Sequence, residues 1–128
     1  MAQCNNLILQ CMDFRIQDTL DTWISEQGFV GDIDRVSVAG SCQSKELALR
    51  NIKVGCELHG VKRVILTQHD DCGAYGGHDA FPSLEKEREK LVADMMAVSK
   101  GVLEIFPDVT VMTLFVQQSG DSWKIVDV

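Results

Sequence analysis

Three chemically reactive side chains stand at the end of the first apolar run. Residues 8–15 read ILQCMDFR, which places a thiol, a carboxylate and a guanidinium at alternate positions, Cys11, Asp13 and Arg15. Alternate residues of an extended segment face the same way, so all three side chains can address one crevice. Neither a core strand nor a disulfide needs this combination. We therefore interpret the segment as part of a chemical site.

A histidine and a second cysteine follow another apolar run. His69 and Cys72 lie in the segment QHDDCGAY, directly after the β-branched run VILTQ. Their i and i+3 spacing around a turn allows both to bind one ion, and Cys11 can supply a third, distant ligand. Zinc prefers thiolate and imidazole, and three protein ligands leave a fourth position for water. The sequence thus predicts Zn²⁺ at Cys11, His69 and Cys72; the alternative is that both cysteines are small buried hydrophobes.

The remaining cysteines and histidines have less specific surroundings. Cys42 follows a predicted strand and can lie near the same crevice as a further ligand, whereas Cys4 and Cys56 are interpreted as small buried hydrophobes. His59 ends a predicted helix, where its charge suits the helix dipole. His78 lies in a glycine-rich loop, either as a solvated side chain or as a proton carrier.

Composition limits the class of protein. The 128 residues are 45% hydrophobic, which is typical of one domain, and we expect 1–128 to form it. The net charge of −7 and the lack of a Lys/Arg-rich run argue against a nucleic-acid partner. No apolar run approaches the ~20 residues that span a bilayer. Five cysteines without paired spacing favour reduced thiols, and the N-terminus lacks a signal-peptide pattern, so we expect a cytoplasmic location.

Strand and helix patterns alternate along the chain. Strands are expected at 7–10, 35–39, 64–68, 109–116 and 123–128. Helices are expected at 18–28, with Asp18 as the N-cap, at 44–59 and at 84–106.

This order predicts an α/β fold. Four strands form a mostly parallel sheet in the order 2-1-3-4, the fifth is an antiparallel edge strand, and helices cover both faces. Ligands of such sheets bind beyond the carboxyl ends of the strands. The residues that follow the first and third strands, Cys11 and His69, should therefore converge.

The two motifs are similar to those of the β-class carbonic anhydrases. That family carries Cys-x-Asp-x-Arg after its first strand, which matches CMDFR at 11–15, and His-x-x-Cys-Gly after its third, which matches HDDCG at 69–73. Between them, the family has an Ala-Gly-Gly turn that opens a helix, and the segment beginning VAGSC resembles it. The resemblance covers roughly residues 5 to 75.

The resemblance implies that Cys11, His69 and Cys72 bind zinc and that Asp13 and Arg15 form a catalytic dyad. It implies reversible hydration of carbon dioxide to bicarbonate by a zinc-bound hydroxide. Asp13 would orient the hydroxide, or displace water from zinc in a resting form, and Arg15 would hold Asp13 by charge-assisted hydrogen bonds. It also implies at least a homodimer.

Two other functions stay open. A zinc hydrolase of the same fold would act on carbonyl sulfide or carbon disulfide, and a non-enzymatic zinc-binding domain would have its site closed by Asp13 or Cys42. The family usually carries Arg-Asn before its Ala-Gly-Gly, where this chain has Ser37 and Val38, and its second glycine is Ser41 here. These departures bear on the substrate more than on the metal.

Overall fold

The computed structural model describes residues 2–128, and it contains five strands and three helices. The strands are β1 (Asn6–Cys11), β2 (Ile33–Val38), β3 (Arg63–His69), β4 (Thr110–Ser119) and β5 (Ser122–Asp127). The helices are α1 (Gln17–Glu26), α2 (Lys45–Leu58) and α3 (Leu84–Ile105), with short 3-10 turns at Phe14–Ile16, Gly73–Tyr75 and His78–Ala80. None of the described helices is long and apolar enough to cross a membrane.

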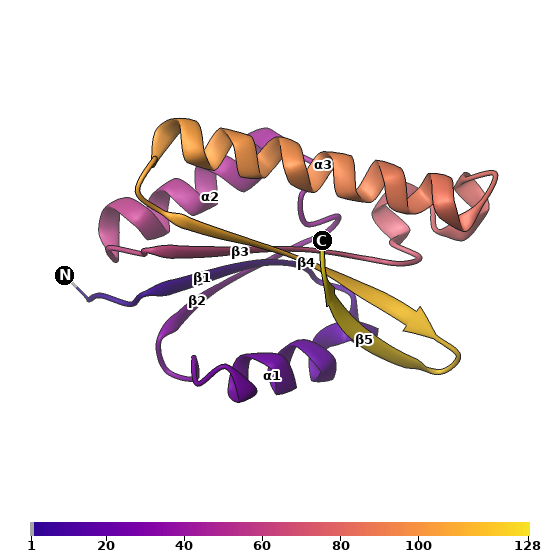
Figure 1. The fold of residues 1–128 in the computed structure, drawn as a ribbon, viewed down its shortest axis with the longest axis horizontal. Coiled ribbons are helices and arrows are strands. Elements are labelled where there is room, and N and C mark those ends of the chain that lie inside the picture. The colour runs from indigo at the N-terminus through magenta and orange to yellow at the C-terminus, as the bar shows by residue number, and fades with distance from the viewer. Residues whose placement is uncertain (1) are drawn as a thin grey trace.

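The five strands form one sheet in the order β2-β1-β3-β4-β5. The pairs β1–β2, β1–β3 and β3–β4 are parallel, and β4–β5 is antiparallel. Figure 1 shows α2 and α3 on one face of the sheet and α1 on the other. The predicted α/β fold, strand order and two-sided helix cover are therefore confirmed.

Two apolar layers hold the sheet between the helices. β1 and β3 are the central strands and are buried along almost their whole length. Because successive side chains of a strand face opposite ways, Leu9 and Leu66 join the layer under α2 and α3, while Ile8 and Ile65 join the layer toward α1. Burial on both faces keeps the ends of β1 and β3 in a fixed relation.

The start of the first helix differs from the prediction. Asp18 is not the N-cap: α1 begins at Gln17, and Ile16 occupies the cap position without a side-chain hydrogen bond. The chain turns earlier, because the Asp13 side chain accepts a hydrogen bond from the Arg15 amide and opens the 3-10 turn that leads into α1. Asp18 lies in the first helical turn, where a carboxylate still suits the dipole.

Candidate metal centre

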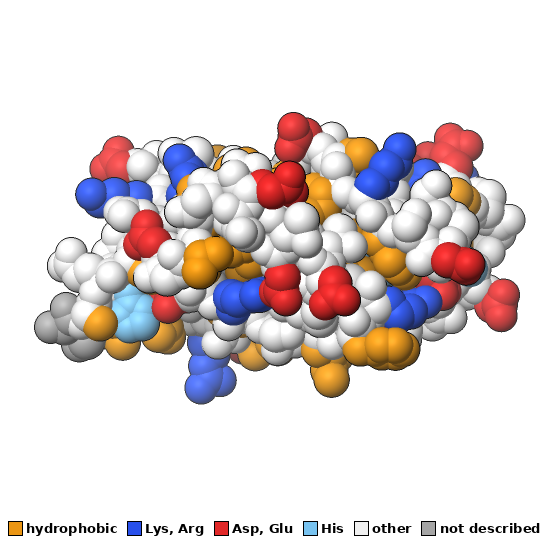
Figure 2. Space-filling model, turned by 90° about the horizontal axis from the view of Figure 1, so that it is seen from below, with side chains coloured by type: hydrophobic (Ala, Val, Ile, Leu, Met, Phe, Trp, Pro, Cys, Tyr) orange, Lys and Arg blue, Asp and Glu red, His pale blue; other side chains and the backbone are white. Residues whose placement is uncertain are grey.

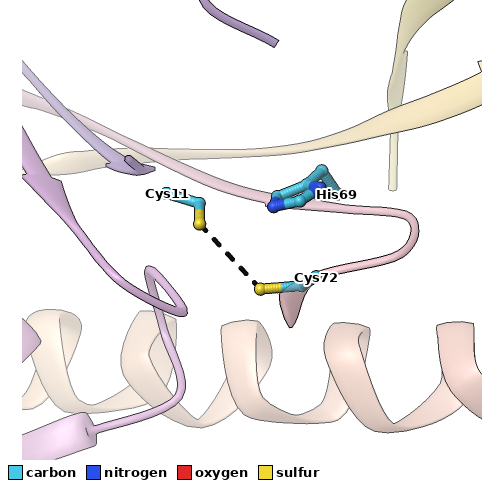
Figure 3. Close-up of side chains that lie close together, drawn as sticks. All are labelled: Cys11, His69 and Cys72. Atoms are coloured by element: carbon cyan, nitrogen blue, oxygen red, sulfur yellow. Dashed lines mark hydrogen bonds between the residues drawn. The ribbon is translucent and has the colours of Figure 1, made fainter. Parts of the chain in front are cut away.

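Cys11, His69 and Cys72 meet at the carboxyl edge of the sheet. Cys11 is the last residue of β1 and His69 the last of β3, so these neighbouring parallel strands end side by side. The two thiol sulfurs lie 3.9 Å apart, and one ligand atom from each of the three residues lies within 4.8 Å of the others (Figure 3). All three side chains are buried. The sequence-predicted set is therefore brought together.

The orientation of His69 leaves one ring nitrogen without a partner. Its Nδ1 lies 2.7 Å from the carbonyl oxygen of Asp70, so Nδ1 carries the proton and donates it. Arg88 in turn donates to both carboxylate oxygens of Asp70, at 2.9 and 2.6 Å, which anchors that residue. The His69 Nε2 is buried and has no hydrogen-bond partner within residues 2–128. An outward lone pair on a ring fixed through its other nitrogen is the form in which histidine binds metals.

The two thiols are coupled, so that one of them loses its proton easily while the other retains it. A hydrogen bond with Cys72 is the largest influence on Cys11 and lowers its pKa, and a hydrogen bond with His69 also lowers it. The same contact raises the pKa of Cys72. The pair therefore shares one proton, which a cation would displace, because thiolates are the metal-binding form. Two thiolates and one imidazole fit Zn²⁺.

Asp13 and Arg15 form a forked ion pair beside the ligands. The Arg15 Nη2 donates to Asp13 Oδ2 at 2.7 Å, and its Nε donates to Oδ1 at 3.1 Å. These hydrogen bonds are the main reason why the pKa of Asp13 is lowered, so the carboxylate is ionised. Asp13 Oδ2 lies 3.9 Å from His69 Nε2, too far for a hydrogen bond. The carboxylate thus adjoins the ligand group while it is held by Arg15.

Sequence reasoning missed two residues that position Arg15. Its Nη1 donates to Asp71 Oδ2 at 3.0 Å and its Nη2 to the Asp71 carbonyl at 2.9 Å. The guanidinium also lies 5.3 Å from the ring centre of Trp123. Asp71 adopts a φ of +58°, and its amide donates to Glu87 at 2.7 Å, which fixes the turn before Cys72. In the sequence, the only indication that Asp71 positions Arg15 was its place as the second aspartate of the HDDCG motif.

A pocket opens in front of the ion pair. Its volume is about 550 Å³. At its rim, the Phe14 side chain is 85% exposed. A Cβ added to Gly77 would lie 2.8 Å from Asp71 Oδ1, so the bare backbone lets this turn close over the aspartate. The lining residues are Asp13, Phe14, Arg15, Asp71, Gly73, Gly76 and Gly77.

Cys42 lies in the other apolar layer, away from the ligand group. Burial raises the pKa of its thiol to about 12, and it is packed in the core toward α2 and α3. Its neighbour Ser41 has a φ of +50° and donates from Oγ to the Thr67 carbonyl at 2.7 Å. Ser41 therefore adopts the left-handed conformation that glycine favours, and the buried hydrogen bond helps to hold it there.

The other histidines and cysteines have defined neighbours. His78 is not a free loop side chain, because its Nδ1 lies 2.5 Å from Glu87 Oε1. Cys4 and Cys56 are only half-buried against the core rather than fully buried as predicted. His59 is the C-cap residue of α2, as predicted, but it also lies beside Cys4 and Asp34.

Comparisons with known proteins indicate the family and the fold. The family model described as "Putative carbonic anhydrase" matches residues 1–128. An uncharacterized protein of Rickettsia bellii (strain RML369-C) is 28% identical over 136 residues, which cover 94% of this chain and 80% of that protein.

Solved structures share the fold at low identity. A carbonic anhydrase from Glaciozyma antarctica superposes with a TM-score of 0.61 at 22% identity, covering 98% of this chain and 83% of that one. A β-carbonic anhydrase of Sordaria macrospora, one of two described as tetrameric, superposes with a TM-score of 0.59 at 15% identity. The match covers 98% of this chain and 82% of that one.

Proposed function

The chain belongs to the β-class carbonic anhydrase family, and from that premise we propose that it catalyses the reversible hydration of carbon dioxide to bicarbonate. We propose that Cys11, His69 and Cys72 hold a zinc ion. Two observations on His69 carry this proposal: a ring nitrogen lies within 4.8 Å of both thiol sulfurs, and the buried Nε2 has no hydrogen-bond partner among residues 2–128. A buried polar atom without a partner is costly, and a metal ion would satisfy it.

Asp13 is the residue we assign to orientation of the reacting water. When bound, zinc would supply a Lewis acid that makes water nucleophilic near neutral pH. The ionised Asp13 carboxylate lies 3.9 Å from His69 Nε2. It can accept a hydrogen bond from the O–H of the reacting water, which leaves a lone pair of the water oxygen directed toward carbon dioxide. Its acceptor-only character defines the direction of this bond.

Arg15 balances and fixes the charge of Asp13. Two thiolates already cancel the double charge of a zinc ion. An unpaired carboxylate nearby would therefore disfavour the formation of hydroxide from the reacting water. Arg15 offsets that carboxylate through the forked pair, and Asp71 holds the other side of the guanidinium. The result is an acceptor whose position is set from two sides before substrate arrives.

The substrate would enter through the pocket in front of the ion pair. Asp13, Arg15 and the glycine turn at 73–77 line it. On the face that carries α1, basic and acidic side chains are interspersed (Figure 2), which suits a small-molecule substrate better than a nucleic-acid backbone.

We also propose that the protein is a homodimer or a larger homo-oligomer. Met12 and Phe14 flank Asp13 and are 63% and 85% exposed. Two large, exposed apolar side chains on either side of Asp13 suit coverage by a second copy. The β-carbonic anhydrases of Sordaria macrospora, described as tetrameric, support this assignment.

A stopped-flow hydration assay on zinc-loaded protein, with metal analysis of the same sample, tests the function. We expect the wild-type protein to hydrate carbon dioxide in proportion to its bound zinc. Cys72→Ser should lose that zinc and the activity together. Sulfide release from carbonyl sulfide and carbon disulfide is measured in parallel. Sulfide release without carbon dioxide hydration would assign the site to the hydrolase class, and zinc without either activity would assign it to a binding domain.

A further inference from the structure

A second group of side chains of the types that bind metals lies at the amino ends of β1 and β2, opposite the candidate metal centre. Cys4 precedes β1, Asp34 is the second residue of β2, and His59 follows α2. One ligand atom from each lies within 4.8 Å of the other two. Cys4 and Cys11 stand at the two ends of β1, seven residues apart, so the two groups are separated by about 23 Å. They cannot share one ion.

We propose that Cys4, Asp34 and His59 bind a second divalent transition-metal ion of the zinc class. The three residues come from separate segments, and a backbone hydrogen bond from the Cys4 amide to the His59 carbonyl, at 3.0 Å, holds two of those segments together. The backbone thus presents the donors side by side without the metal. A bound ion would tie the N-terminal segment, the edge strand β2 and the end of α2 to one point.

The charges at this group favour a cation. Among the described residues, His59 is the only ion-pair partner of Asp34, with its Nδ1 2.7 Å from Asp34 Oδ2. The Cys4 thiol donates a hydrogen bond to the Asn6 carbonyl at 3.4 Å. Burial and the charge of Asp34 raise the pKa of Cys4, because a thiolate there would face a carboxylate. A divalent ion removes that conflict, since it attracts both anions.

The donor types select the metal. Thiolate and imidazole are poor ligands for Ca²⁺ and Mg²⁺, which prefer oxygen, whereas zinc accepts sulfur, nitrogen and carboxylate oxygen together. Three protein ligands leave a fourth position, and this group is open to solvent, because the side chains of His59 and Asp34 are 34% and 28% exposed. An ion can therefore reach it from solution and keep one water.

Metal binding requires a small opening of the present contact. Nitrogen and oxygen ligands about 2.0 Å from a tetrahedral zinc lie about 3.3 Å from each other. His59 Nδ1 and Asp34 Oδ2 are 2.7 Å apart, so they would separate by about half an ångström. Partly exposed side chains allow this movement. The Cys4 proton must be released as the metal binds, whereas a neutral imidazole can carry its proton on Nε2 and bind through Nδ1, so affinity should rise with pH.

Zinc stoichiometry separates this site from a simple ion pair. Wild-type protein, Cys4→Ser, His59→Gln and the matched control Cys56→Ser are dialysed against buffered micromolar free zinc and analysed for metal. Cys56 is also a half-buried thiol but lies outside both groups. We expect Cys4→Ser and His59→Gln each to bind one ion fewer than wild type, and Cys56→Ser to match wild type. Circular dichroism confirms that each variant is folded.

Cobalt provides an independent readout, because thiolate ligation to Co²⁺ gives a charge-transfer band that Cys4→Ser should weaken. Equal metal content in wild type, Cys4→Ser and His59→Gln would overturn the proposal, as would a single ion that only Cys72→Ser removes. An ion that His59→Gln loses and Cys72→Ser keeps would support this site even if the proposed catalytic centre bound none.

Discussion

Arg15→Lys tests the forked ion pair. Arg15 donates to Asp13 through Nη2 at 2.7 Å and Nε at 3.1 Å, and to Asp71 at 3.0 and 2.9 Å. A lysine keeps the positive charge but has one ammonium group at the end of a flexible chain, which cannot reproduce the fork. It can neutralise Asp13, yet it cannot hold Asp13 and Asp71 in one plane. The substitution therefore separates charge from orientation.

The expected loss follows from the contacts removed. A lysine that keeps one contact to Asp13 loses at least two charge-assisted hydrogen bonds. Each is worth about 1.5–3 kcal/mol when fully buried. The Arg15 side chain is 30% exposed, and solvent screening reduces each to about 1 kcal/mol. If the loss falls on the transition state, about 2 kcal/mol corresponds to a fall of about 30-fold in kcat/KM.

Stopped-flow hydration, normalised to zinc content, measures this loss. Arg35→Lys is the matched control, because Arg35 pairs with Asp21 on the surface, away from the pocket. We expect the control to retain wild-type turnover and both variants to retain zinc. Full turnover by zinc-loaded Arg15→Lys would refute the bidentate role and leave Arg15 as a source of charge only.

Three further predictions address the metal, a titrating pair and the assembly. Cys72→Ser should lose the zinc bound at the carboxyl edge of the sheet and lower the urea midpoint of unfolding, because the binding energy is lost with the ligand. Metal content and an unfolding midpoint that both match wild type, measured on the same sample, would contradict this prediction. Glu87 raises the pKa of His78, so the pair stabilises the fold fully below the ordinary histidine pKa and loses that effect as the pH rises through the raised one. His78→Gln should flatten this decline, and urea unfolding across pH would refute it if wild type and variant declined alike. Light scattering at micromolar concentration should give at least twice the chain mass of 14.2 kDa, and a purely monomeric species would rule out the oligomer.

The ends of the central strands could be predicted from the sequence because local pattern and topology rules agree there. Apolar runs identify β1 and β3, and right-handed crossovers make them parallel neighbours. Once they are neighbours, Cys11 and His69 must lie at the same edge, and Cys72 follows within one turn. That a single domain spans 1–128, and that it is cytoplasmic, stay predictions.

Contacts between distant segments could not be predicted in the same way. Asp71 reaches Arg15 only because the turn after β3 adopts a positive φ, and Trp123 arrives from the far edge of the sheet. Cys4 and His59 each looked structural by itself, because no short motif joins residues 55 positions apart. Their approach depends on where α2 ends relative to β1, which periodicity does not specify.

Asp13→Asn gives the most direct test of the proposed mechanism. Asparagine keeps the shape of the side chain, but its amide group can donate a hydrogen bond where the carboxylate only accepts. Asp18→Asn, on the exposed side of α1, is the matched control. Turnover and zinc content are measured on the same samples of wild type and both variants. We predict that Asp13→Asn retains zinc and loses about 100-fold or more in carbon dioxide hydration, while Asp18→Asn keeps both. Undiminished hydration by zinc-loaded Asp13→Asn would contradict the mechanism.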